Sequence, residues 1–271
     1  MFPTLASIES AAIAASTGIA GYVWFWLLLL SFALLELIAP GRQSNIDQQA
    51  RIQVNFALGL CNAVIVLVPF LSEITLAELV RREGWGLLNA RSVPGWAAFA
   101  GGILLFDLGY YLRHRIEHGW PLLWRLHRVH HSDAAMDLST TFRTHPIDVL
   151  VGIAFNLAII ALFGVPPAAV ALHGLVRQLV MAWGHANLAP FPRLSRAAGW
   201  LIVTPAFHAR HHSAAHMETD SNFAIVLTLW DRLFRTISRG TKPVARFGLG
   251  DGYDSGASRI TAQLRLPFDP V

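Results

Sequence analysis

The stretch that decides the fold runs from residue 94 to residue 131 and reads PGWAAFAGGILLFDLGYYLRHRIEHGWPLLWRLHRVHH. Its first part, residues 94–111, is almost entirely apolar and forms a run of the kind that crosses the roughly 30 Å hydrocarbon layer of a bilayer as a helix. The helical pattern continues past this run into a segment that carries five histidines. We therefore predict one helix that leaves the membrane and brings histidines to its surface.

The composition around this stretch is that of a membrane protein. The chain has 271 residues, of which 54% are hydrophobic and only 14% are charged, and its mean hydropathy is +0.46. These values are too apolar for an ordinary soluble domain. The basic residues are scattered instead of forming a stripe, which argues against nucleic-acid binding. Cys61 is the single cysteine and lies in an apolar run, so the chain forms no internal disulfide.

Three further apolar runs cover residues 22–40, 52–71 and 147–184. The last is interrupted by Val165-Pro166-Pro167 and reads as a helical hairpin whose halves, of roughly 17 residues each, just suffice to cross and return. The predicted fold is an all-α, integral-membrane bundle with about four crossings and a His-rich helical cap. We divide the chain into an N-terminal non-cytoplasmic segment (1–21), a membrane-embedded domain (22–240) and an irregular C-terminal tail (241–271).

Basic residues indicate the orientation of this bundle. The segments expected on the histidine side (41–51, 112–146 and 186–271) contain 17 Lys and Arg, against 3 on the opposite side. Because short cytoplasmic loops are enriched in Lys and Arg, this bias places the histidines at the cytoplasmic face. We expect the inner membrane of a bacterium.

The histidines are strongly clustered: eight of the twelve form three groups. The groups are His114-x3-His118, His127-x2-His130-His131 and His208-x2-His211-His212. On a helix, residues at i, i+3 and i+4 share one face, so we expect each H-x-x-H-H to aim its imidazoles at a common point.

Eight converging imidazoles exceed what one ion accepts, since zinc takes about four ligands and a mononuclear Fe(II) oxygenase uses two His and a carboxylate. A ferritin-like site needs a Glu-x-x-His motif, and no Glu in this chain has His at i+3. Two metal ions that share eight to ten histidines are the simplest interpretation.

Four histidines lie outside the clusters. We predict His185, at the end of the hairpin, as a ninth ligand and His145, which precedes Pro146, as a tenth. His173 is 12 residues before His185, roughly 18 Å deeper along a helix, and we expect it inside the bundle. His216 is expected at the surface.

The motifs resemble the fatty acid hydroxylase/sterol desaturase superfamily. The resemblance rests on the histidine motifs from Asp107 to His118, 123–132 and 205–213, together with Asp220-Ser-Asn222-Phe and Trp230-Asp231-Arg-Leu-Phe-Arg-Thr236, and covers about residues 50–240. It implies a di-iron centre on the cytoplasmic side of a helical bundle, O2 as co-substrate, and hydroxylation or desaturation of a lipid. Some members have another histidine four positions before His185, where this chain has Met181.

Carboxylates near the histidines can orient imidazoles and offset the +4 charge that neutral ligands leave on two ferrous ions. A partner of this kind binds the second ring nitrogen of a ligand histidine. We assign both roles to Asp107, which lies on the same helical stripe as His114, and to Asp231, and we assign the positioning role alone to the neutral amide of Asn222; around Asp231 and Asn222 the surrounding residues match the family. Asp133, Asp137 and Asp220 are further candidates.

The leading prediction is an oxidoreductase that hydroxylates a C–H bond of a fatty acyl, sterol-like, carotenoid or alkyl lipid. Desaturation on the same centre is the alternative, and a non-enzymatic haem carrier or metal transporter is a distant one. No fused electron-transfer domain is evident, so we expect a separate electron-transfer protein. Zinc is expected to replace iron readily in purified protein. The sequence identifies neither the substrate nor the oligomeric state.

Overall fold

The computed structural model describes residues 7, 10–11, 19–68, 72–90, 92–188, 192–240, 243–250 and 258–270. In this part of the chain the regular structure is helical, apart from three isolated β-bridges. The helices are α2 Ile19–Ile38, α3 Gln48–Val66, α4 Glu73–Glu83, η2 Leu87–Asn89, α5 Gly95–Gly119, α6 Pro121–His131, η3 Leu138–Phe142, α7 Pro146–Phe163, α8 Pro167–His185, α9 Pro192–Ala198, α10 Pro205–His211, α11 His216–Thr219, α12 Leu229–Leu233, α13 Ile260–Arg265 and η5 Leu266–Phe268.

Proline and glycine set the ends of the helices that position the histidines. Proline occupies a first-turn position of α6, α7, α8 and α10, where its missing N–H costs no hydrogen bond. The predicted break between α7 and α8 is confirmed at Gly164, which has φ of 68° and ends α7 in the left-handed conformation. The helix α5 runs unbroken from the apolar stretch through His114 and His118, also as predicted.

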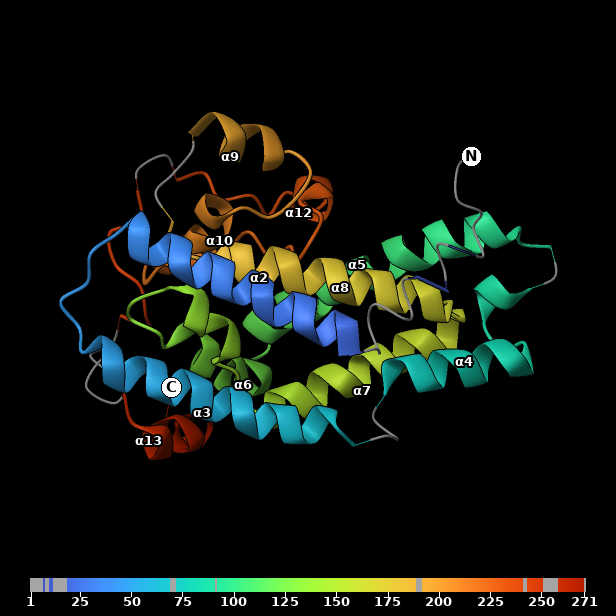
Figure 1. Ribbon diagram of the computed structural model, residues 1–271, viewed down its shortest axis with the longest axis horizontal. Coiled ribbons are helices and arrows are strands. Elements are labelled where there is room, and N and C mark those ends of the chain that lie inside the picture. Colours follow the sequence, from blue (N-terminus) through green and yellow to red (C-terminus); the bar gives the residue numbers. More distant parts are fainter. Residues whose placement is uncertain are drawn as a thin grey trace.

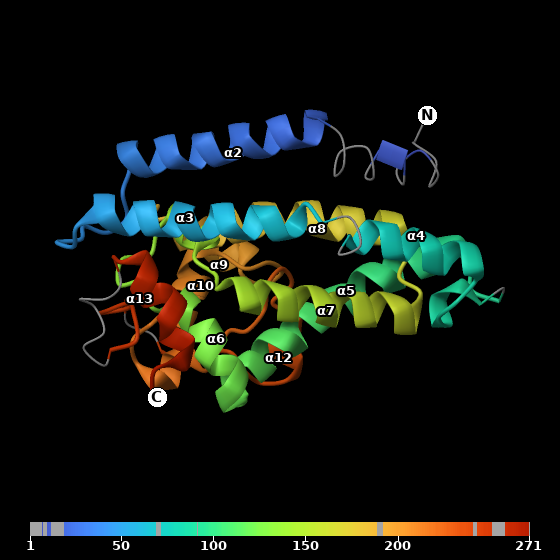
Figure 2. The ribbon, with the colours of Figure 1, turned by 90° about the horizontal axis from the view of Figure 1, so that it is seen from below.

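The long helices α2, α3, α4, α5, α7 and α8 form a bundle along the longest axis of the molecule (Figure 1, Figure 2). The helices α5 and α8 run toward one end of the bundle and end there, and α7 starts from the same end. The core of the bundle is apolar and includes Phe106, Ile160, Ala169 and Val170. This packing fixes the ends of α5 and α8 beside one another, where their histidines can meet.

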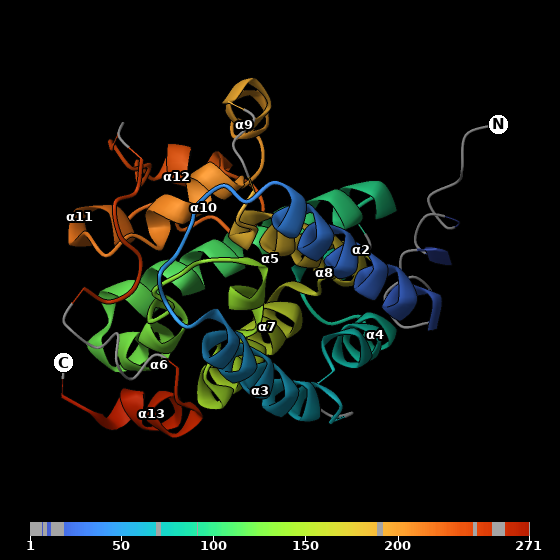
Figure 3. The same cartoon turned by 60° about the vertical axis from the view of Figure 1, so that its left-hand side comes forward.

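The short helices α6, η3 and α9–α13, with η5, cover the end of the bundle where α5 and α8 finish, and we call this part the cap (Figure 3). The C-terminal region contributes to the cap. The sequence predicted an irregular tail from residue 241 onwards, but part of this region is helical. Ile260–Arg265 forms α13, and Leu266 packs against Val54, Leu58 and Val129. These contacts join the end of the chain to α3 and α6.

Two described helices, α5 and α7, are long and apolar enough to cross a membrane, and α2 contains a shorter apolar segment, Trp26–Ile38. Many apolar side chains of α2 and α3 face outwards, among them Leu30, Leu34, Leu60 and Val64. Fewer helices thus meet the criteria for crossing a membrane than the four crossings predicted. The exposed apolar side chains nevertheless agree with a surface that contacts lipid. The predicted N-terminal segment 1–21 lies largely outside the described residues.

Candidate metal centre

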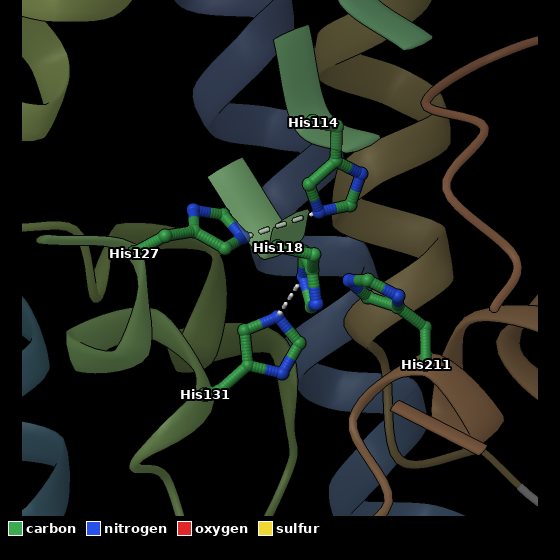
Figure 4. Close-up of side chains that lie close together, drawn as sticks. All are labelled: His114, His118, His127, His131 and His211. Atoms are coloured by element: carbon green, nitrogen blue, oxygen red, sulfur yellow. Dashed lines mark hydrogen bonds between the residues drawn. The ribbon is translucent and has the colours of Figure 1, made fainter. Parts of the chain in front are cut away.

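Nine histidines meet at the junction of the bundle and the cap. Their ligand nitrogens form two adjoining sets, each within 4.8 Å. The first, which we call the five-histidine group, consists of His114, His118, His127, His131 and His211 (Figure 4). The second, the four-histidine group, consists of His130, His185, His208 and His212. The rings of His131 and His212, one from each group, stack with centroids 4.5 Å apart.

The two H-x-x-H-H motifs do not each aim at one point, as we had expected, but divide between the groups. His127 and His131 of α6 join the five-histidine group, whereas His130 joins the four-histidine group. In the other motif the allocation is reversed: His208 and His212 belong to the four-histidine group, and His211 belongs to the five-histidine group. Residues at i and i+4 differ by about 40° around a helix, whereas i+3 lies about 60° to the other side. Each motif therefore contributes to both groups.

The outward ring nitrogens of four histidines face backbone carbonyls. The Nδ1 atoms of His114, His130, His185 and His211 lie 2.7, 3.0, 2.8 and 2.8 Å from the carbonyl oxygens of Phe223, Arg143, Met181 and Ser221. A carbonyl oxygen only accepts, so each Nδ1 carries the proton and donates it. The Nε2 atom of each ring is then an unprotonated lone-pair donor that points into the group.

The inward nitrogens of several ring pairs lie close to one another. The Nε2 atoms of His114 and His127 are 3.1 Å apart, and those of His118 and His131 are 3.2 Å apart (Figure 4). The same distances occur between His185 and its neighbours in the four-histidine group. His130 and His185 both donate from Nδ1 to carbonyls, so their facing Nε2 lone pairs, 3.2 Å apart, repel unless a cation lies between them. Nitrogens that bind one ion at about 2.1 Å are about 3 Å apart as neighbouring ligands. The donor set therefore fits two metal ions.

Burial keeps the rings in the form that metals bind. It lowers the pKa of His130, His131, His208 and His212 well below the usual value, and the neighbouring imidazoles act in the same direction. These rings are consequently neutral at pH 7. A metal ion can bind them without displacing a proton.

Carboxylates contact the outward nitrogens of two ligands in the five-histidine group. Asp148 Oδ2 lies 3.2 Å from His127 Nδ1, and a Glu117 oxygen lies 3.6 Å from the same atom. Burial alone would lower the pKa of His127, but these carboxylates outweigh it and raise that pKa. Asp220, one of the predicted candidates, lies 3.1 Å from His118 Nδ1.

Sequence reasoning missed Glu117 and Asp148. Glu117 directly precedes His118, and Asp148 lies in the first turn of α7, two residues after Pro146. Their proximity to the histidine motifs was the available signal. The sequence does not show which side of each helix faces the site.

Two of the predicted partners, Asn222 and Asp231, act on a loop and not on an imidazole. Asn222 adopts φ of 55°, and its side chain donates to the Phe207 carbonyl at 2.9 Å. Asp231 accepts from the backbone N–H groups of Phe223 and Ala224 at 2.9 and 2.7 Å. These contacts hold the loop 221–224, whose carbonyls accept from His114 and His211. Burial raises the pKa of Asp231 to about 6, although its hydrogen bonds act in the opposite direction.

Asp107 contacts His173 and not a histidine of either group. Its Oδ1 lies 3.0 Å from His173 Nε2, and its Oδ2 accepts from Trp230 Nε1 at 2.8 Å and from the Leu227 N–H at 3.2 Å. His173 is buried in the bundle, as expected, and its partner is Asp107.

The structure also places His145 outside both groups. His145 precedes the first turn of α7, and its Nδ1 accepts from the Ile147 N–H at 3.1 Å. This histidine therefore caps a helix. His216 is exposed, as expected.

A buried ionic network supports the histidines of α6 from behind. Arg51 and Arg143 are both fully buried, and Arg51 pairs with Asp133 at 2.9 Å. Arg143 donates to the Asn55 side chain and to the Val129 carbonyl, while its own carbonyl accepts from His130. Burial would raise the pKa of Asp133, but Arg143 and Arg51 hold it below its usual value. The network thus ties α3 of the bundle to the helix that supplies three ligands.

The comparisons with known proteins agree with this geometry. Residues 99–236, roughly half of the chain, match the family described as fatty acid hydroxylase. This span contains all nine histidines of the two groups. The chain belongs to the fatty acid hydroxylase family, which confirms the resemblance seen in the sequence.

Several curated proteins are similar to parts of the chain. Human alkylglycerol monooxygenase is 32% identical over 62% of this chain and 36% of its own length. An ornithine lipid hydroxylase from Rhizobium tropici is 30% identical over 62% of this chain and 49% of its own length. A cholesterol 25-hydroxylase-like protein from Danio rerio is 26% identical over 77% of this chain and 84% of its own length. The chain thus spans at most about half the length of the first two relatives, and no solved structure matches it.

Proposed function

We propose that this protein is a membrane di-iron oxygenase that uses O2 to hydroxylate a C–H bond of a lipid. The observation that carries the proposal is the pair of adjoining histidine groups, in which nine buried imidazoles aim ring nitrogens at one another. Side chains alone cannot oxidise an unactivated C–H bond, whereas two bound iron ions supply O2 activation when electrons are delivered to them.

The residues of the chain have three roles in this proposal. The nine histidines hold the ions, and the loop 221–224 and the network of Arg51 and Arg143 keep the imidazoles in place. Burial excludes water from the centre, which protects a reactive oxidant from side reactions. The electrons are proposed to come from a separate electron-transfer protein.

A lipid substrate is supported by the relatives and by the surface. The names of the three relatives refer to an alkylglycerol, an ornithine lipid and cholesterol, which are all lipids. The same names describe a monooxygenase and hydroxylases, so we favour hydroxylation over desaturation. The outward apolar side chains of α2 and α3 suit a protein that takes its substrate from the bilayer.

We place the bundle in an inner membrane, with about four crossings, and the cap on the cytoplasmic side. The helices α5 and α7 support the crossing, because they are long and apolar enough. The excess of Lys and Arg in the segments on the cap side supports the orientation.

The geometry argues against a haem carrier. A porphyrin bound between two histidines needs a flat slot between their rings, whereas the Nε2 atoms here approach to 3.1 and 3.2 Å. A single zinc ion is also a poor fit, because it would leave about five of the nine imidazoles without a ligand role.

The proposal is tested in cells that express the full chain together with a suitable electron donor. Lipid extracts are compared by mass spectrometry with those from cells that express His131→Ala. We expect a lipid that gains one oxygen atom only with the unmodified protein, with label incorporated from ¹⁸O2. A product that loses two hydrogens instead would show desaturation, and identical lipid profiles with a working donor would refute the enzyme assignment. The purified protein should contain two metal ions per chain, iron or the zinc that replaces it.

A further inference from the structure

The two histidine groups differ in what lies behind their ligands. In the five-histidine group, His127 faces Asp148 and Glu117, and His118 faces Asp220. Asp148 and Glu117 are both buried, so their charges are little screened by water. The negative charge on the outward side of the imidazoles makes them stronger donors on the inward side.

The four-histidine group has neutral partners in the described part of the chain. His130 and His185 donate to the carbonyls of Arg143 and Met181. The Nδ1 atoms of His208 and His212 are buried and have no hydrogen-bond partner there. Asp133 is a buried carboxylate whose charge acts on His185, and it is paired with Arg51.

We propose that the five-histidine group is the tight metal site and the four-histidine group the labile one, and that Asp148 is the main positioning residue behind this difference. The five-histidine group has one more ligand and gains negative charge from Asp148, whereas the charge of Glu117 is offset by Arg113. The proposal rests on the proposed di-metal centre and adds an order of loading: the five-histidine group fills first and empties last.

Asp148 is the stronger candidate because of its geometry. Its carboxylate accepts directly from His127 Nδ1 at 3.2 Å, whereas Glu117 lies 3.6 Å away and pairs with Arg113 at 3.2 Å. The side chain of Asp220 is 38% exposed, so water screens its charge more strongly. The effects of removing these charges should decrease from Asp148 to Asp220.

The test is an equilibrium competition for Zn²⁺ between the full-length protein in detergent and a chromophoric chelator. Two dissociation constants that differ by at least about tenfold are expected for the unmodified protein. His211→Ala should remove the tighter site, and His208→Ala should remove the weaker one. Two equal constants, or a tighter site that persists in His211→Ala, would overturn the assignment of the sites.

Carboxylate variants test the role of Asp148. Asp148→Asn keeps the shape of the side chain and should weaken only the tighter site, by about 10- to 100-fold. Asp220→Asn should weaken the same site less, and it tests the charge effect at an exposed position where folding is not at risk. Thr141→Val, which removes a hydroxyl 3.2 Å from His185 Nδ1, should affect only the weaker site, and Glu78→Gln on the exposed part of α4 should affect neither.

Stoichiometry separates the failure of this proposal from the failure of the proposed function. A chain that binds two ions with equal affinity, or in which Asp148→Asn leaves the tighter constant unchanged, contradicts only the inference drawn here. A chain that binds fewer than two ions when zinc is in excess contradicts the di-metal centre itself.

Discussion

Along α2 the large apolar side chains face outwards, with Trp24 71% and Leu37 79% exposed, whereas in and beneath the cap Arg51, Arg143 and Asp231 are fully buried. The two regions therefore follow opposite rules. A surface of Trp and Leu is stable against lipid tails and unfavourable in water. Buried charges persist only where each has a partner, because an unpaired one costs several kcal/mol. The bundle is built to contact a membrane, and the cap to hold a polar centre away from water.

The largest expected effect comes from exchanging one buried histidine in each region. His131→Ala removes a ligand from the five-histidine group, and we expect loss of at least one metal ion per chain and of all hydroxylated product. His173→Ala removes a histidine of the bundle whose nearest polar partner is Asp107. This variant should keep both ions, as measured by elemental analysis of the purified protein. Loss of stoichiometric metal from His173→Ala would show that the bundle and the cap form one site.

Acid should destabilise the cap more than the bundle when metal is absent. Burial holds the pKa of His130, His131, His208 and His212 below the 6.5 of the unfolded chain. The unfolded state therefore binds more protons below pH 6.5, and the free energy of unfolding falls as the pH falls through that value toward the folded pKa. Each histidine contributes up to about 1.4 kcal/mol per pH unit, so the total reaches several kcal/mol by pH 5.

Hydrogen exchange at pH 7 and pH 5 on chelator-treated protein measures this difference region by region. Protection should fall in α6 and α10, whereas the end of α7 remote from the histidines, where Ile159 and Ile160 are buried, should change little. Equal loss of protection in both regions would contradict the assignment of the acid sensitivity to the histidines.

Substituting Arg51, whose network lies beneath the cap, and Arg82, on the surface of the bundle, compares buried with exposed ion pairs. Arg51→Ala leaves the buried Asp133 without its closest cation and should lower the free energy of unfolding by about 3–5 kcal/mol. Arg82→Ala breaks a pair with Glu78 in which the arginine side chain is 69% exposed, and should cost less than about 1 kcal/mol. Denaturant unfolding in detergent measures both values. Similar losses for the two variants would mean that water reaches the cap network.

The regularity of the bundle is why so much of the fold was predictable. Apolar runs flanked by polar loops, prolines and glycines marked α2, α3, α5, α7 and α8 within a few residues, including the break at Gly164, whereas α4 lies in a segment expected to be a loop. The docking of α13 was not predictable, because it depends on contacts of Leu266 with Val54 and Val129, which are far apart in the chain. No local pattern in the residues after 240 indicates those contacts.

The sequence identified which histidines form the candidate site, but not how they divide between the two groups. Clustering identified the eight motif histidines, and the place of His185 at the end of a helix suggested the ninth. The division into two groups depends on how α6 and α10 are rotated about their axes, which packing determines. For the same reason Asp107, which shares a helical stripe with His114, contacts His173 of α8 and no metal-binding histidine. His145 was predicted as a metal ligand, but it caps α7.

The smallest expected effect concerns the contact between the bundle and the cap through Trp230. Its Nε1 donates to Asp107 Oδ2 at 2.8 Å, and the same oxygen accepts from the Leu227 N–H at 3.2 Å. Trp230→Phe removes one of these two donors and keeps an aromatic ring, so the free energy of unfolding should fall by about 1 kcal/mol. Trp96→Phe, at a side chain that is 69% exposed, is the matched control and should change it by less than about 0.5 kcal/mol.

The number of metal ions bound by Trp230→Phe shows whether the contact between Trp230 and Asp107 also supports the metal centre. The remaining Leu227 donor and the contacts of Asp231 should hold the loop 221–224, so both ions are expected to stay bound in Trp230→Phe. Release of the ion from the five-histidine group would show instead that Asp107 positions this loop through Trp230, because the carbonyls of Ser221 and Phe223 accept from two ligands of that group. The bundle would then help to hold the metal ions. The bundle and the cap would still differ in their contact with lipid, but both would contribute to the metal centre.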